Sequence, residues 1–298
     1  METTLVATLT RPGQRARDVL GLFKLRIGVF IMLSALVGFA VTPGSHLSLA
    51  QVIVLALSVL VASASAGAFN QYAEADTDRL MARTRTRPFA TGALPRTPAW
   101  LLLMATMLAG SVAAAWSALN GMAALYVFLG AFFYGVVYTL WLKRRTAWNI
   151  VIGGLAGSFA VLAGAAAVDP GVGVHGWLLA LALFLWTPPH FWSLAIAGQA
   201  DYAAAGVPML PVVVGTERAA RIVYGSAVTL ALASLLPMLF GAGFVYLAGA
   251  LGGGLYFVLK ARALAAAPSR ATAIGSFLAS LVQLGTLLAA ASIDGVMR

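Results

Sequence analysis

The chain has 298 residues, of which 61% are hydrophobic and 9% are charged, and it contains no cysteine. A soluble domain carries about 25% charged residues, so this composition excludes a soluble globular protein as well as a disordered or fibrous one. Without cysteine, disulfides, Cys-ligated metal centres and a thiol nucleophile are excluded. In such an apolar chain the net charge of +10 is first a signal of membrane topology, and it does not indicate nucleic-acid binding.

Nine apolar segments are long enough to cross a bilayer, which takes about 20 residues. They are rich in Gly and Ala, which let helices approach closely in lipid. The sequence therefore predicts an all-α fold, a polytopic membrane bundle of nine transmembrane helices. Residues 1–23 are expected to form a cytoplasmic N-terminal segment and residues 24–298 a single bundle domain. The expected spans are 24–42, 51–70, 99–119, 121–142, 148–168, 176–198, 222–241, 243–261 and 272–292.

The basic residues predict the orientation of this bundle. Of the 19 Lys and Arg residues, 18 lie at the N-terminus or in the loops that follow even-numbered spans. The positive-inside rule places the N-terminus and these loops in the cytoplasm, and the C-terminus on the periplasmic or extracellular side. A bacterial inner membrane is favoured over a mitochondrial one, because Met1–Thr10 does not read as an Arg- and Ser-rich transit peptide.

Acidic residues are few, and three of the nine follow the second span. If that helix continues, Asn70, Glu74 and Asp78 lie at i, i+4 and i+8 and fall within about 80° of one another on one face. Asp76 then points elsewhere. Oxygen ligands that face a bundle interior at the membrane edge predict a hard-cation site, of the kind that suits Mg²⁺.

Two basic clusters lie on the same side of the membrane as these carboxylates. Arg83 and Arg87 follow the second span, and Lys143 and Arg144 follow the fourth. Forked guanidinium groups beside a carboxylate-bound cation are suited to a polyphosphate. The same residues also set topology, and the two roles remain open for both clusters.

The sixth span contains the motif WTPPHFW at residues 186–192. Its two prolines are expected to kink or break the helix. His190 lies about 13 Å inside the cytoplasmic end of the span, where a histidine usually faces the bundle interior. A hydrogen-bonded structural histidine is the alternative. Aromatic residues near the end of the fourth span, Tyr134 and Tyr138 among them, fit either an interface belt or a site.

Four ordered stretches of the chain resemble the UbiA-type intramembrane prenyltransferases, and within them the branch that acts on heme. The first is the aspartate-rich pattern Asn-x-x-x-acid-x-x-x-Asp, after the second span. The resemblance covers roughly residues 24–221, and the last three spans match only as apolar helices. The matching stretches are 70–88, 143–157 (KRRTAWNIVIGGLAG), 186–192 and 201–214 (DYAAAGVPMLPVVV).

The resemblance implies an enzyme that transfers a farnesyl group from farnesyl diphosphate to a vinyl group of heme B, in the lipid bilayer. It implies a Mg²⁺ cofactor and a catalytic, metal-binding set of four residues, and it makes a downstream heme-modifying enzyme or an oxidase assembly factor a possible partner. The implied metal-binding set is Asn70, Glu74, Asp78 and Asp201. The implied substrate-binding set is Arg83, Arg87, Lys143, Arg144, Tyr134, Tyr138, His190 and Tyr202.

The chain departs from the family pattern at three places. Glu74 stands where aspartate is more common, Gln199 and Ala200 precede Asp201 where basic residues are usual, and residues 157–161 lack a common proline pair.

Two other interpretations of the function stay open, one within the enzymes and one outside them. One is an aromatic prenyltransferase for a quinone precursor such as 4-hydroxybenzoate. The other is a transporter or a heme-protein assembly factor, although a transporter is expected to carry ionisable groups near the midplane.

Overall fold

The computed structural model of the chain describes residues 12–44 and 46–297. Within these residues, nine helical segments are long and apolar enough to cross a membrane. The predicted all-α fold and the predicted number of spans are thus confirmed. The first segment begins at Ala16 rather than at residue 24, because a helix already precedes the expected span. The expectation for Met1–Thr10 lies outside the described residues.

Short helices interrupt or follow several of the long ones. In chain order, the bounds of all the described helices are α1 (Pro12–Leu22), α2 (Leu25–Ala40), α3 (Leu49–Ala73), α4 (Ala75–Asp78), α5 (Pro88–Thr91), α6 (Pro98–Ala118), α7 (Gly121–Phe132), η1 (Phe133–Leu142), α8 (Asn149–Gly153), α9 (Leu155–Val168), α10 (Val174–Ala197), α11 (Gln199–Ala204), α12 (Leu210–Val214), α13 (Thr216–Ala233), η2 (Leu236–Phe240), α14 (Phe244–Ala266) and α15 (Arg270–Met297).

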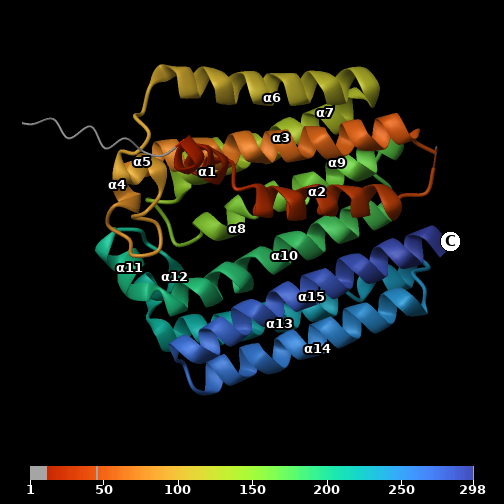
Figure 1. Cartoon of the computed structure of the whole chain (residues 1–298). Helices are drawn as coiled ribbons and strands as arrows, with labels where there is room; N and C mark the ends of the chain where they lie inside the picture. The colour runs from red at the N-terminus through yellow and green to blue at the C-terminus, as the bar shows by residue number, and fades with distance from the viewer. Residues whose placement is uncertain (1–11, 45, 298) are drawn as a thin grey trace, which may run out of the picture.

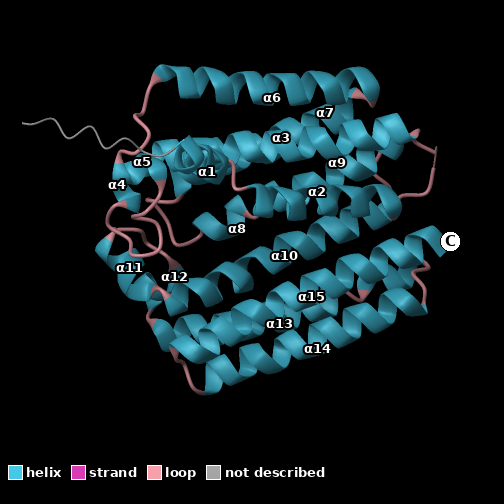
Figure 2. Ribbon diagram, in the orientation of Figure 1, coloured by secondary structure: helices cyan, strands magenta, loops and turns pink. Residues whose placement is uncertain are grey.

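The long helices run side by side, and the part of the chain described here contains no strand (Figure 1, Figure 2). Helices α2, α3, α6, α7 and α9 pack together in the first half of the chain, and α13, α14 and α15 in the second, with α10 joining the two groups. The short helices α4, α5, α11 and α12 gather at one end of the bundle, on the left in Figure 1, and the C-terminus lies at the other. Connections rich in polar residues therefore meet at a single end.

Glycine allows α2 and α9 to approach at backbone distance. A Cβ atom on Gly164 would collide with the backbone oxygen of Ala35, and one on Gly38 would collide with the backbone oxygen of Val161. Close contact of this kind gives dispersion attraction between helices in lipid, where the hydrophobic effect does not drive association. Large apolar side chains instead face outward: Phe244 is 86% exposed and Leu102 70%, as a surface solvated by lipid requires.

Candidate active site

The polar end of α3 continues into α4 with an almost unbroken backbone ladder. The N–H of Glu74 donates to the oxygen of Asn70 (3.0 Å), and the N–H of Asp78 donates to the oxygen of Glu74 (2.8 Å). The i, i+4, i+8 spacing is therefore kept, and all three side chains are at most 3% exposed. Asp76 lies outside this set, with its side chain 62% exposed and paired with Arg96 at 3.0 Å.

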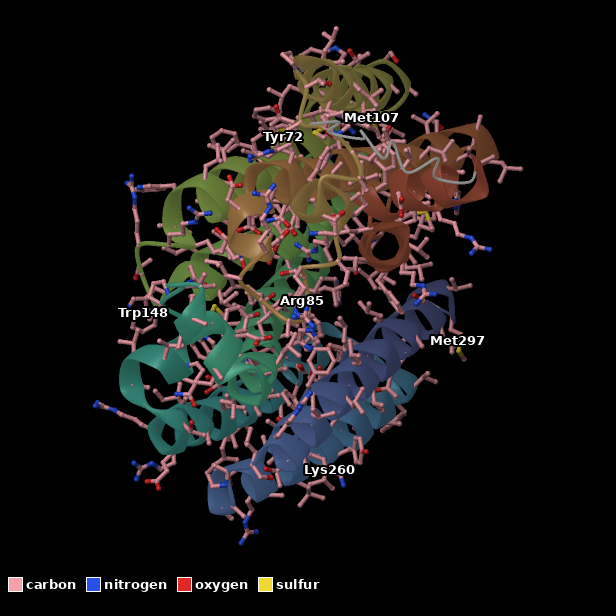
Figure 3. All side chains as sticks on the ribbon, turned by 60° about the vertical axis from the view of Figure 1, so that its left-hand side comes forward. Tyr72, Arg85, Met107, Trp148, Lys260 and Met297 are labelled. Atoms are coloured by element: carbon pink, nitrogen blue, oxygen red, sulfur yellow. The ribbon has the colours of Figure 1, made fainter. Side chains whose placement is uncertain are left out.

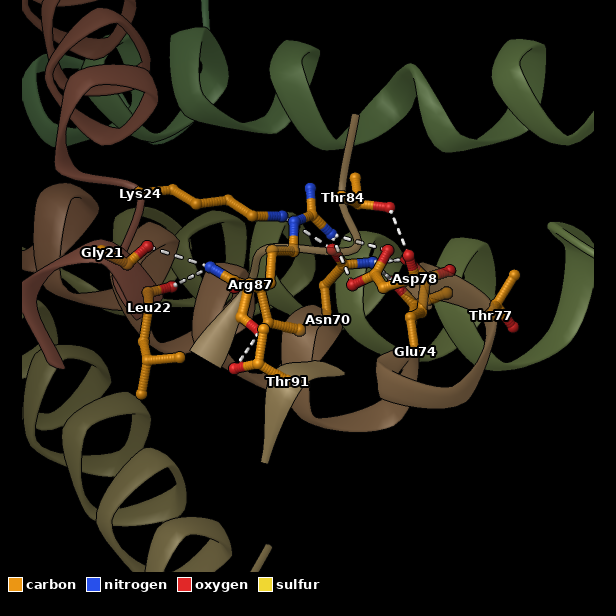
Figure 4. Close-up of polar contacts among 12 residues, drawn as sticks. Gly21, Leu22, Lys24, Asn70, Glu74, Thr77, Asp78, Thr84, Arg87 and Thr91 are labelled. Carbon is orange, nitrogen blue, oxygen red and sulfur yellow. Dashed lines mark hydrogen bonds and ion pairs between the residues drawn. The ribbon is translucent and has the colours of Figure 1, made fainter. Parts of the chain in front are cut away.

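Each member of this set has a cationic partner from another part of the chain. Nζ of Lys143 lies 2.5 Å from Oε1 of Glu74, and Nη1 of Arg87 lies 3.0 and 2.8 Å from the two carboxylate oxygens of Asp78. Nζ of Lys24 donates to Oδ1 of Asn70 at 2.7 Å. Figure 4 shows the side chains of Lys24 and Arg87 turned toward those of Asn70, Glu74 and Asp78.

Basic side chains outnumber the acidic ones in this group. Lys24, Lys143 and Arg87 face the two carboxylates of Glu74 and Asp78 and the amide of Asn70. Buried charges are tolerated only when they are paired and hydrogen-bonded. Three partly buried basic side chains at the end of a membrane bundle suit an anion with several oxygens, and Arg and Lys are the side chains that bind phosphate.

Lys24 was not among the site residues that the sequence predicted. It stands at the break between α1 and α2 in a left-handed conformation (φ 47°, ψ 42°), which costs a non-glycine residue about 1–3 kcal/mol. The break directs its side chain to Asn70, and its Nζ also donates to the hydroxyl of Tyr134 at 3.1 Å. A basic residue at the start of the expected first span was the only signal in the sequence, and it indicated topology alone.

The end of the fourth span is wound as a π-helix, η1, and this places the two predicted tyrosines. The N–H of Lys143 donates to the oxygen of Tyr138, five residues earlier, at 2.9 Å. The rings of Tyr134 and Tyr138 stack with centroids 5.8 Å apart. A Cβ on Gly153 would lie 2.8 Å from the ring of Tyr138, so this glycine makes room for the ring. Single-turn π segments are often found at functional sites.

Aromatic faces and cations adjoin in this group. Nζ of Lys24 lies 5.6 Å from the ring centroid of Tyr134, and Nζ of Lys143 lies 5.8 Å from that of Tyr138. Because Nζ of Lys24 is hydrogen-bonded to the hydroxyl of Tyr134, it lies at the edge of that ring. Lys143 is within the distance range of cation–π attraction to Tyr138.

The remaining predicted basic residues differ in their contacts. Arg144 donates to the hydroxyl of Thr77. Arg83 is exposed, and its side chain makes no hydrogen bond or ion pair with any described residue. Figure 3 shows blue nitrogen atoms gathered around Arg85 where this end of the bundle faces the viewer. In the loop of residues 79–87, Arg79 and Arg87 are thus held by hydrogen bonds and ion pairs, whereas the side chains of Arg83 and Arg85 are unpaired within the described chain.

Helix α11 carries Asp201 and Tyr202. The Asp201 side chain is half-buried and makes no hydrogen bond or ion pair within the described ranges, so the structure does not bring it into contact with Asn70, Glu74 or Asp78. Tyr202 is buried. Gln199, where the family pattern has a basic residue, donates to the oxygen of Pro211 at 2.7 Å. It therefore ties α11 to α12 and does not present a charge.

His190 lies in α10 and belongs to a separate group of contacts with α15. Its Nδ1 is 2.6 Å from Oγ of Ser280. Of the expected kink or break at the prolines, the break is not observed, since α10 runs from Val174 to Ala197 through both of them. Thr187 donates its hydroxyl to the oxygen of Leu183 at 2.9 Å.

The donor set at the end of α3 fits a hard divalent cation. Glu74 and Asp78 supply carboxylate oxygens and Asn70 an amide oxygen, all on one buried face, and oxygen donors of this kind are preferred by Mg²⁺. The described residues hold no group of three or more His, Cys, Asp or Glu side chains arranged for a metal. A cation here would therefore depend on the amide and on oxygens from a ligand or water.

Comparison with known proteins shows which family the whole bundle resembles. Residues 31–287 match the model of the UbiA prenyltransferase family. The chain is 54% identical to protoheme IX farnesyltransferase 2 of Paramagnetospirillum magneticum, over 92% of this chain and 96% of that protein. It is 40% identical to protoheme IX farnesyltransferase of Hyphomonas neptunium, over 91% and 86% of the two chains.

Two solved structures share the fold. One concerns digeranylgeranylglyceryl phosphate synthase, with a TM-score of 0.78 at 17% identity, over 96% of this chain and 100% of the other. The other is a UbiA homolog from Archaeoglobus fulgidus bound to DMAPP and Mg²⁺, with a TM-score of 0.74 at 19% identity, over 91% and 99%. The family model matches most of the chain, and the resemblance predicted from four motifs is confirmed. The chain is an integral membrane protein of the UbiA prenyltransferase family.

Proposed function

We propose that this protein transfers a farnesyl group from farnesyl diphosphate to a vinyl group of heme B, in a Mg²⁺-dependent reaction that yields heme O and diphosphate. The observation that carries the proposal is the buried group at the end of α3, in which two carboxylates and three cations meet beside two stacked tyrosines. The choice of heme as acceptor is supported by the names of the relatives, which align along nearly the full chain.

The residues divide the work by charge. Asn70, Glu74 and Asp78 would hold Mg²⁺, which supplies charge neutralisation for the diphosphate. Lys24, Lys143 and Arg87 lie at hydrogen-bond distance from these residues, so the same cations are placed to hold diphosphate oxygens. Arg83 has its donors free of described partners and would bind an outer oxygen. Arg144 and Tyr202 would line the same end of the bundle, with Asp201 brought in only by movement of α11.

The chemistry needs a leaving diphosphate and an acceptor. The C1–O bond of farnesyl diphosphate breaks, and its electron pair leaves with the diphosphate. The faces of Tyr134 and Tyr138 steady the allylic cation, and the dry helix interior delays its capture by water. The vinyl π-electrons of heme B then form the new bond to C1. Water adds to the resulting benzylic-type cation and loses a proton, which leaves a hydroxyethylfarnesyl substituent.

The proposed setting is the bacterial inner membrane, with the short helices α4, α5, α11 and α12 in the cytoplasm. Its support is the concentration of Lys and Arg in the loops at that end of the bundle, as the positive-inside rule requires. Farnesyl diphosphate is water-soluble at its head and apolar in its tail, so it would enter from the cytoplasm at this end. A heme-modifying enzyme or an oxidase assembly factor would receive the product.

The product identifies the reaction. Membranes that contain the protein are supplied with heme B, farnesyl diphosphate and Mg²⁺, and the extracted hemes are resolved by reverse-phase chromatography with mass detection. The proposal predicts a new heme heavier by one farnesyl group and one hydroxyl group, and a further ¹⁸O mass shift when the reaction is run in H₂¹⁸O. Prenylated 4-hydroxybenzoate without a new heme, in a parallel reaction, would assign the protein to aromatic acceptors. If folded protein forms neither of these two products, catalysis on both acceptors is refuted.

A further inference from the structure

His190 is held in one orientation between two transmembrane helices. Its ring stacks on Trp186, with centroids 4.0 Å apart and planes at 21°, and on Phe277, with centroids 4.5 Å apart and planes at 29°. The residue is 5% exposed. Phe191 packs perpendicular to the imidazole, with centroids 4.8 Å apart and planes at 83°. Because aromatic rings cover both faces and Phe191 occupies part of one edge, a further partner of the imidazole has to approach at a ring nitrogen.

The hydrogen bonds at one edge fix the position of the ring proton. Oγ of Ser280 donates its single hydrogen to the backbone oxygen of Phe277 at 2.6 Å. A hydroxyl has one proton to give, so toward Nδ1 of His190, 2.6 Å away, Ser280 can act only as acceptor. Nδ1 therefore carries the proton. An imidazolium without a carboxylate partner is costly in a membrane interior, so the ring is neutral and Nε2 presents its lone pair.

That lone pair has no partner within the described chain, and it is not sealed off. The fully enclosed side-chain atoms without a hydrogen bond include the amide of Gln283 and the indole nitrogen of Trp192. Nε2 of His190 is not one of them, so a small part of its surface remains accessible. Histidines that bind a metal have this arrangement: one ring nitrogen is unprotonated, and the other donates its N–H to an acceptor that fixes the orientation of the ring.

We propose that Nε2 of His190 binds the iron of the porphyrin substrate as an axial ligand, and that Ser280 is the residue that positions it. The proposal rests on the function proposed above and names the contact that holds the acceptor. It also decides between two contacts for His190. A propionate needs a proton donor, and Nε2 in this tautomer has none, whereas a ferrous or ferric iron needs the lone pair that is present.

The location of His190 agrees with a separate acceptor position. The residue lies seven positions before the end of α10 at Ala197, which is about 10 Å along the helix axis. A porphyrin ligated there would lie in the membrane-embedded part of the bundle. The short helices at the end of the bundle would remain available for the diphosphate.

Binding of two porphyrins tests the ligation directly. Purified protein in detergent is titrated with heme B and with metal-free protoporphyrin IX, which carries the same propionates but no iron. The wild-type chain is expected to bind heme B at least tenfold more tightly than the metal-free ring. His190→Gln should remove that preference, and its ferric heme should lose the electron paramagnetic resonance signature of axial histidine. Added imidazole should restore this signature.

Matched variants separate positioning from general damage. His175→Gln changes the other histidine of the same helix, and it should keep the preference for heme B. Ser280→Ala should weaken heme binding by about tenfold, the usual effect of losing the outer partner of a ligating histidine, and should leave metal-free binding unchanged. Ser276→Ala, which instead breaks the 2.9 Å contact with Ser193, should affect neither.

Two results would overturn the ligation. One is equal affinity of the wild type for the two porphyrins, and the other is a preference for heme B that persists in His190→Gln. If either result is found while the wild type still forms farnesylated heme, only the proposed iron ligation fails. If it binds neither porphyrin and forms no farnesylated heme, the proposed function fails with it.

Discussion

Lys143 and Glu74 join two spans that are far apart in the sequence. Nζ of Lys143 lies 2.5 Å from Oε1 of Glu74 and donates to Oε2 at 2.6 Å, across a separation of 69 residues. The carboxylate side chain is 3% exposed and the lysine side chain 12%. The pair therefore joins the π-helical end of the fourth span to the polar end of the second. It places a basic and an acidic side chain next to each other in the candidate site.

Removal of the lysine should destabilise the bundle. Lys143→Met leaves Glu74 buried without its cation, and breaking a buried pair in this way costs about 3 kcal/mol. Thermal unfolding in detergent should show a lowered midpoint, whereas Arg145→Met, at an exposed neighbour without an ion pair, should unfold like the wild type. The double variant Lys143→Met with Glu74→Gln should recover most of the stability but no activity. Full activity in the double variant would contradict a role for this pair in the reaction.

Arg83 should affect substrate binding without affecting stability. Its side chain has no hydrogen bond or ion pair within the described residues, so the folded protein loses little in Arg83→Gln. A charge-assisted hydrogen bond is worth about 1.5–3 kcal/mol, which predicts a rise of roughly tenfold or more in the KM for farnesyl diphosphate. Steady-state kinetics on Arg83→Gln and on Arg85→Gln, its exposed neighbour in the same loop, make the comparison. An equal change in both variants would assign the effect to general surface charge.

Lys24 should be needed for the reaction, although it lies outside the motifs of the family. Lys24→Met removes the donor to Asn70 and to Tyr134, and with it one of the three basic side chains of the site. Loss of one donor at a charge-stabilising site typically slows a reaction by about 100-fold. Turnover of farnesyl diphosphate is measured beside that of Arg26→Met, an exposed basic residue two positions later. Wild-type turnover in Lys24→Met would remove this residue from the site.

Helix contact at Gly164 should not tolerate a methyl group. The added Cβ of Gly164→Ala would meet the backbone of Ala35 in α2, whereas that of Gly157→Ala, in the same helix, meets no atom within 4 Å. Overpacking costs about 1–3 kcal/mol. The first variant should unfold at lower temperature and the second should not. Equal unfolding temperatures would mean that α2 and α9 do not pack as described.

Much of the bundle is predictable because lipid imposes simple rules on sequence. Length and hydropathy locate the spans, and the i, i+4 rule places Asn70 and Glu74 on one face, where an amide N–H of Asn70 donates to Glu74 at 2.8 Å. Asp76 points away for the same reason. These features depend on local periodicity, which a single sequence contains.

The partners of the carboxylates are not predictable in the same way. The sequence offers many basic residues at this end of the bundle, and only the tertiary fold selects Lys24, Lys143 and Arg87 as the ones that reach Asn70, Glu74 and Asp78. The selection depends on the left-handed residue at the break after α1 and on the π-helical winding of η1. Neither has a hydrophobic period that distinguishes it from an ordinary helix. The bond between His190 and Ser280 spans 90 residues and is hidden from the sequence for the same reason.

The dependence of heme farnesylation on Mg²⁺ and on Asp78 tests the central claim most directly. The rate of formation of the new heme is measured against Mg²⁺ concentration for the wild type, Asp78→Asn and Asp76→Asn. The account predicts that the wild type and Asp76→Asn respond alike, and that Asp78→Asn is at least about 100-fold slower at every concentration. Equal rates for Asp78→Asn and Asp76→Asn, or formation of the new heme in the presence of a chelator, would contradict it.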